Sequence, residues 1–112
     1  MNYSSPNSKR RRQEDQPWHL VLFVARESSA SANAIVQLKR IAAEYLPARS
    51  IVEVVDLFAE PDRAEEEQIL AVPTLVRKTP QPVRRVIGDL SDISRVLTSI
   101  GFIMNNPGLT IS

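Results

Sequence analysis

Blocks of apolar residues separated by polar stretches run along the chain, and the first half of this pattern predicts a strand, a helix and a second strand. Residues 19–25 (HLVLFVA) form a short apolar run between polar neighbours, which is typical of a strand buried on both faces. Residues 50–57 (SIVEVVDL) predict the second strand. The helix between them should begin after Ser31 as N-cap and end before Pro47. Its apolar stripe consists of Ile35, Leu38, Ile41, Ala42 and Tyr45.

The second half of the pattern predicts a short helix followed by two strands. Pro61 suits the first turn of a helix, where its missing N–H is not needed. We expect Ile69 and Leu70 to anchor this helix to the core. Residues 74–78 and 83–87 are the two strands, and the short link between them suits a hairpin.

A final amphipathic helix closes the pattern. Its apolar positions recur at i, i+3, i+4 and i+7, namely Ile93, Val96, Leu97 and Ile100. We expect Asp89 or Ser91 to cap its start and Gly101 to end it.

The predicted order is βαβαββα, which is an α/β fold. The first strand–helix–strand unit requires parallel pairing through a right-handed crossover. Val72-Pro73 then leads into the third strand as a cis-proline turn does in thioredoxin-like folds. We therefore predict a thioredoxin-like domain over residues 18–102, with a mixed four-stranded sheet. Residues 1–17 are expected to be a disordered basic arm and residues 103–112 a flexible tail.

The composition excludes several kinds of chemistry. The 112 residues contain no cysteine, so thiol redox chemistry and thiolate metal sites are excluded. His19 is the single histidine, and its place at the start of a buried strand favours packing over catalysis. Glu65, Glu66 and Glu67 are consecutive and point in different directions around a helix, so we expect no metal site there. No phosphate-binding glycine motif occurs. We expect no enzyme activity and no cofactor.

The signals for localisation and the net charge say little about function. No apolar run is long enough to span a membrane and no secretory leader is evident, so we expect a cytoplasmic protein without membrane contact. The net charge is +1. Residues 9–12 (KRRR) could contact nucleic acid, but no basic, aromatic-studded strand accompanies them, and nucleic-acid binding is not expected.

Four cations lie close together on the third and fourth predicted strands: Arg77, Lys78, Arg84 and Arg85. Two interpretations remain open. The cations could keep an edge strand soluble, or they could form a docking patch that steers an acidic partner.

Several stretches together resemble the KaiB family of circadian-clock proteins. They are LVLFVA, VVDL, EPDRAEEEQILAVPTL and, most specifically, PVRRVIGDLSD. The resemblance implies a non-enzymatic protein that binds a KaiC-type RecA-like ATPase ring, modulates its phosphorylation and sequesters a KaiA-like protein. The alternative is a free sensor or adaptor that is similar to the KaiB-like domain of a histidine kinase and has no clock role.

The resemblance also implies two folds for one sequence. Besides the thioredoxin-like monomer, we expect a ground-state fold with the order βαββααβ, which forms a homodimer or homotetramer. The two arrangements would differ mainly in the C-terminal half, and by only a few kcal/mol. The expected fold-switch positions are Pro73, Pro80, Pro82, Gly88 and Asp89. One departure from the family pattern is Gln81, which interrupts the usual run of prolines.

Overall fold

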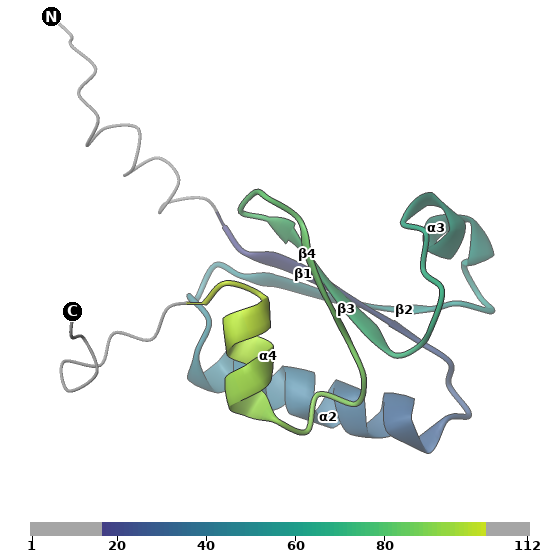
Figure 1. The fold of residues 1–112 in the computed structure, drawn as a ribbon, viewed down its shortest axis with the longest axis horizontal. Helices are drawn as coiled ribbons and strands as arrows, with labels where there is room; N and C mark the ends of the chain where they lie inside the picture. The colour runs from purple at the N-terminus through teal and green to yellow at the C-terminus, as the bar shows by residue number, and fades with distance from the viewer. Residues whose placement is uncertain (1–16, 103–112) are drawn as a thin grey trace, which may run out of the picture.

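The computed structural model describes residues 17–102 (Figure 1). Its elements are β1 (His19–Val24), α2 (Ser29–Glu44), β2 (Ile51–Asp56), α3 (Pro61–Glu66), β3 (Thr74–Thr79), β4 (Arg84–Ile87) and α4 (Ile93–Ser99). The predicted βαβαββα order is confirmed, and the alternative βαββααβ order is not the one observed. Most of the predicted basic arm and all of the predicted tail lie outside the described residues.

The four strands form one mixed sheet in the order β2-β1-β3-β4. β1 runs parallel to β2, as the crossover through α2 requires, and antiparallel to β3, which in turn pairs antiparallel with β4. β1, one of the two inner strands, is the most apolar strand, and its residues 20–24 are all buried. β2 and β4 are the edges of the sheet.

Helices α2 and α4 lie on one face of the sheet, and α3 lies on the other face near one end (Figure 1). We call the first the closed face and the second the open face. The side chains of each strand alternate between them. The closed-face core joins β1, β3 and β4 to both helices, through Leu20, Leu22, Val24, Leu38, Ile41, Leu75, Val86, Val96, Leu97 and Ile100. The open-face core is smaller and comprises Val21, Phe23, Val55, Ala64 and Val76.

The start of α2 differs from the prediction. Ser28 is the N-cap, and its side chain accepts a hydrogen bond from the backbone N of Ser31 at 3.1 Å. Ser31 is instead buried in the first turn, where its Oγ accepts a hydrogen bond from the backbone N of Ala25 at 3.0 Å. The prediction was wrong because several serines precede the apolar stripe, and any of them could cap the helix. The predicted stop before Pro47 is confirmed, since the helix ends at Glu44.

The short helix α3 begins at Pro61, as predicted. Ile69 packs against the open-face core, but Leu70 is 96% exposed, so its predicted role as an anchor is wrong. The helix ends at Glu66, and Gln68 has a φ of 57°. The helical phase that would have turned both side chains inward is therefore lost before Leu70.

The boundaries of α4 are also partly as predicted. Its N-cap is Asp92, whose side chain accepts from the backbone N of Arg95, so neither Asp89 nor Ser91 caps it. The end is as expected, because Gly101 has a φ of 80° and donates to Thr98 O. Phe102 N donates to Leu97 O, which completes a Schellman motif.

Candidate functional site

The four cations singled out in the sequence occupy two faces of the sheet and do not form one patch. Arg77 lies on the closed face and is only 4% exposed, so its expected place on an exposed cationic surface is wrong. Its Nη1 donates to Ile100 O and its Nη2 to Pro82 O, both at 2.6 Å. The guanidinium carbon also lies 5.2 Å from the centroid of the Trp18 ring. Arg77 thus connects the end of α4, the β3–β4 link and the segment before β1.

Burial lowers the pKa of Arg77, and the positive charge of nearby Arg84 lowers it further. Both guanidinium groups approach Gly101, since a Cβ added there would lie 2.7 Å from Arg77 Nη1 and 3.1 Å from Arg84 Nε. The side chain of Arg84 is exposed, and none of the ion pairs within residues 17–102 involves it.

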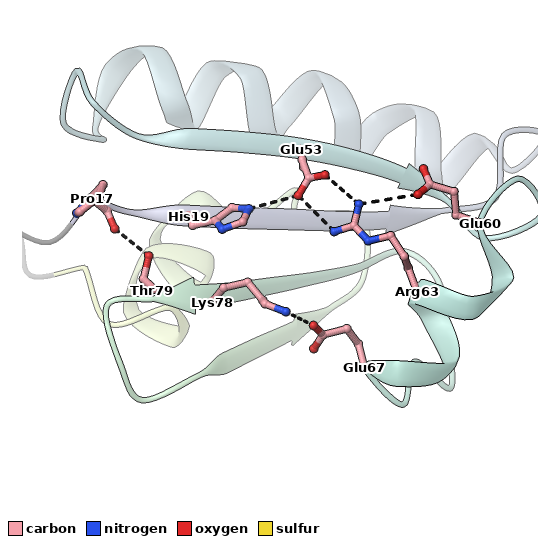
Figure 2. A network of polar contacts seen from close by, with 8 residues as sticks. All are labelled: Pro17, His19, Glu53, Glu60, Arg63, Glu67, Lys78 and Thr79. Carbon is pink, nitrogen blue, oxygen red and sulfur yellow. Dashed lines mark hydrogen bonds and ion pairs between the residues drawn. The ribbon is translucent and has the colours of Figure 1, made fainter.

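Lys78 and Arg85 lie on the open face, where both approach Glu67 of the α3–β3 loop. Lys78 Nζ donates to a Glu67 carboxylate oxygen (Figure 2), and Arg85 Nη2 lies 3.9 Å from the other oxygen. One carboxylate therefore faces two cations. When Arg84 is included, three cations are balanced by this one carboxylate, so positive charge is in excess around β4.

A second group of polar side chains on the open face was not identified from the sequence. Arg63 of α3 donates two hydrogen bonds to the Glu53 carboxylate, at 2.7 and 3.1 Å, and also lies 3.7 Å from Glu60 (Figure 2). His19 Nε2 lies 3.1 Å from the same carboxylate. These contacts hold the pKa of Glu53 at about 2, with the Arg63 hydrogen bonds contributing most and His19 next.

Part of that group could have been found from the strand pattern. In the parallel register His19 pairs with Ile51 and Val21 with Glu53. Because side chains alternate, His19 and Glu53 then share one face. The contribution of Arg63 could not have been foreseen, since it depends on how α3 packs. His19 is paired in this group, with about a third of its side chain exposed.

The expected fold-switch positions surround β3 and β4. The bonds Val72-Pro73, Thr79-Pro80 and Gln81-Pro82 are all cis, so the predicted cis-proline turn at Pro73 is confirmed. Gly88 has a φ of 127°. Asp89 accepts a hydrogen bond from the backbone N of Ser91 at 3.1 Å. The Ser91 side chain, and after it this backbone N–H, lower the Asp89 pKa by hydrogen bonding to the carboxylate.

A shallow apolar groove lies between β4 and the loop that leads into β3. Its volume is about 300 Å³, and it is lined by Gln68, Ile69, Leu70, Thr74, Arg85 and Ile87. A larger groove of about 710 Å³ runs between the second half of α2 and the edge strand β2. Within residues 17–102 no cluster of acidic and histidine side chains could hold a metal ion, and no helix has the length and apolarity needed to cross a membrane.

Comparison with known proteins gives a family and a fold. The KaiB domain model matches residues 21–101. Circadian clock protein KaiB3 of Synechocystis sp. is 38% identical over 84 residues, which cover 75% of this chain and 82% of that protein. The circadian clock oscillator protein KaiB of Microcystis aeruginosa is 42% identical over 81 residues, covering 72% of this chain and 78% of the relative.

The structural neighbours have thioredoxin-like folds. Mitochondrial thioredoxin 3 of Saccharomyces cerevisiae superposes with a TM-score of 0.65 at 17% identity, covering 87% of this chain and 89% of that one. The N-terminal domain of Synechococcus elongatus SasA superposes with a TM-score of 0.61 at 23% identity, covering 81% of this chain and 90% of the domain. At such identities the likeness concerns the fold alone.

Proposed function

The chain belongs to the KaiB family, and from this premise we propose that it is a cytoplasmic, non-enzymatic clock regulator that binds a KaiC-type RecA-like ATPase ring and modulates its phosphorylation or activity. The observation that carries the proposal is the family match over residues 21–101, supported by relatives that are circadian clock proteins. A KaiA-like protein is a further partner that the family membership suggests.

The chemistry of the chain supports a binding role. The chain shares its fold with thioredoxins but contains no cysteine, so it cannot carry out their thiol–disulfide exchange. The charged side chains of the open face are paired with one another, as in Glu53 with Arg63 and Lys78 with Glu67. Such pairs give a surface specific charge without supplying a nucleophile.

We assign partner binding to Lys78 of β3 and to Arg84 and Arg85 of β4. Positive charge at this edge would steer an acidic surface and raise the association rate. Arg77, expected to join them, would act indirectly by holding α4 and the β3–β4 link in place, because its guanidinium is buried.

We further propose that the chain has a second, homo-oligomeric fold in its resting state, a dimer or tetramer. Pro73, Pro80, Pro82, Gly88 and Asp89 are the proposed positions of the change. They all lie between the residue that precedes β3 and the start of α4, and the change would therefore repack the C-terminal half.

The binding proposal is tested by co-elution of the full chain with the KaiC-type ATPase ring of the same organism, in ATP and in ADP. We expect a complex that forms over hours of incubation and contains the thioredoxin-like form. Failure to detect a complex in either nucleotide would reject the proposal. An unchanged phosphorylation state of the ring within the complex would reject the modulation but keep the binding.

The second candidate is a free sensor or adaptor that keeps the thioredoxin-like form permanently. The observed strand order, which is that of the thioredoxin-like form, is what favours it. NMR spectra distinguish the two candidates. Two sets of backbone amide signals in slow exchange support the clock regulator, whereas one thioredoxin-like set at all concentrations supports the adaptor.

A further inference from the structure

We propose that strand β4 accepts an extended acidic segment of the partner protein as a fifth strand, whose apolar side chains enter the groove beside Leu70. The identity of the partner rests on the proposed function, whereas the mode of binding rests on the structure of this edge. Four observations carry the proposal: the direction of the β4 backbone groups, the exposed apolar side chains, the groove and the charge.

The backbone of β4 presents free hydrogen-bonding groups at the edge of the sheet. Gly88 N donates to Pro73 O at 3.0 Å, so these two residues form a hydrogen-bonded pair. Hydrogen-bonded and non-hydrogen-bonded pairs alternate along an antiparallel ladder, so Val86, two residues earlier, also bonds to β3. The N–H and C=O groups of Arg85 and Ile87 therefore point outward, away from β3. They are the groups that a further strand would pair with.

The side chains of the same two residues border the groove. Arg85 and Ile87 pair with Val76 and Thr74, and both line the groove of about 300 Å³ on the open face. Ile87 is 59% exposed, and Leu70 on the opposite wall is 96% exposed. An added strand would place every second side chain over this groove. Burying Leu70 and Ile87 in this way would remove two large apolar side chains from water.

The charge of the edge favours an acidic segment. Arg84 has no ion-pair partner within the described residues, and Arg85 shares Glu67 with Lys78. The other edge strand, β2, is different. Its two carboxylates are already paired with arginines, Glu53 with Arg63 and Asp56 with Arg26. Carboxylates of an incoming strand would therefore gain new partners at β4 but not at β2.

This edge could have two other roles: protecting the chain against aggregation, or pairing with a second copy of the chain. Both agree less well with the observations than the addition of a partner strand does. Cations on an edge strand often prevent aggregation and need have no other role. Such protection does not explain why Leu70 and Ile87 are exposed beside them. A second copy of the chain pairing through its own β4 would bring Arg84 and Arg85 of both copies together. Like charges that face each other across strands are destabilising, which disfavours this arrangement.

Amide hydrogen exchange in the complex tests the proposal directly. In the chain bound to the KaiC-type ring, we expect exchange at the amides of Arg85 and Ile87 to slow by about tenfold or more, because each would gain a hydrogen bond. The amide of Val86, already bonded to β3, is the internal control. A complex in which these two amides exchange as in the free chain, or in which β2 is protected instead, overturns the proposal.

Two variants probe the edge and the groove separately. Ile87→Pro removes an outward N–H without removing a bond to β3, and should weaken binding by about tenfold or more. If this variant loses its native amide spectrum, Leu70→Asp replaces it, since a side chain that is 96% exposed contributes little to folding. Leu70→Asp should weaken binding by a similar factor, because it removes an apolar contact and its carboxylate repels an acidic segment. Phe58→Asp is the matched control, because Phe58 is 76% exposed and does not line the groove. Equal effects of the last two variants would contradict the proposal.

A second experiment uses a synthetic peptide in place of the ATPase ring, so that strand addition is tested independently of ring binding. A synthetic peptide that alternates glutamate and valine should perturb the amides of Arg85 and Ile87, and one that alternates lysine and valine should not. If the ring fails to bind the wild-type chain, the proposed function fails while the peptide result still decides the strand addition. Equal perturbation by both peptides, or none by either, overturns it. Self-association of the chain through β4 instead of peptide binding would also overturn it.

Discussion

Basic side chains lie in different environments on the two faces of the sheet. On the closed face Arg77 is buried between strand, loop and helix, and its hydrogen bonds go to backbone carbonyls. On the open face Lys78 and Arg85 remain partly exposed and pair with a side-chain carboxylate. Neighbouring positions of one strand, Arg77 and Lys78, thus fall in different environments because β-strand side chains alternate.

The difference indicates which surface is available for binding. Two helices and the larger apolar core cover the closed face, so a change there costs stability. The open face carries one short helix, a smaller core and charged groups that water already reaches. A partner can replace those exposed contacts without unfolding the domain. The following changes test how different the two faces are.

The largest effect should come from removing core side chains on the two faces of β1. Leu22 and Phe23 are adjacent and both 0% exposed, but they point to the closed and the open face respectively. We expect Leu22→Ala to cost about 4 kcal/mol in the free energy of unfolding and Phe23→Ala about 3 kcal/mol. The smaller core under α3 should relax into the cavity more easily. Urea denaturation measures both values, and a larger loss for Phe23→Ala would show that the open-face core does not relax into the cavity more easily than the closed-face core.

Removing the buried cation should have the next largest effect. Arg77→Met keeps most of the apolar volume but leaves Ile100 O and Pro82 O without their donor. We expect the free energy of unfolding to fall by about 2 to 4 kcal/mol. Arg84→Met is the control on the same face, and should change it by less than about 0.5 kcal/mol. Similar losses in the two variants, measured by thermal or urea unfolding, would mean that the Arg77 contacts add little.

The order of the elements could be predicted from the sequence because it depends on local patterns. The apolar run of residues 19–25, the helical stripe ending before Pro47 and the Pro73 turn each specify one element without reference to the others. Local signals of this kind also placed Gly101 at the end of α4. The family membership was likewise predictable, since the PVRRVIGDLSD stretch lies within the matched region.

The details of the candidate site could not be predicted, because they depend on tertiary packing. The choice between Ser28 and Ser31 as N-cap depends on where the chain leaves β1, and the burial of Arg77 depends on the position of α4. Leu70 follows a helix that ends earlier than its apolar residues suggest. Strand alternation alone could have separated Arg77 from Lys78, had the two sides of the sheet been known.

A smaller effect is expected at the connection from β4 to α4. Gly88 has a φ of 127°, and apart from its two neighbours in the chain no residue has an atom within 4 Å of the position that a Cβ would take. Gly88→Ala should therefore destabilise this fold through backbone strain alone, by about 1 kcal/mol. If a second, oligomeric fold exists, its share should rise on a sizing column. Thr98→Ala, at an exposed position of α4, is the control. An unchanged stability and elution profile would make Gly88 an ordinary turn residue.

The smallest effect should appear in the acid stability of the open face. The pKa of Glu53 is lowered from 4.5 to about 2 by Arg63 and His19, so the folded state holds this carboxylate charged more strongly than the unfolded state does. Its contribution is complete above about pH 4.5 and is lost as the pH falls towards 2. Because 38% of the side chain is exposed, we expect only about 0.2 to 1 kcal/mol. Urea denaturation of wild type and Glu53→Gln should differ by that amount near neutral pH and converge near pH 2. A difference that persists undiminished in acid would show that the glutamate stabilises the domain through its packing, and that the open face is less solvent-screened than its exposure indicates.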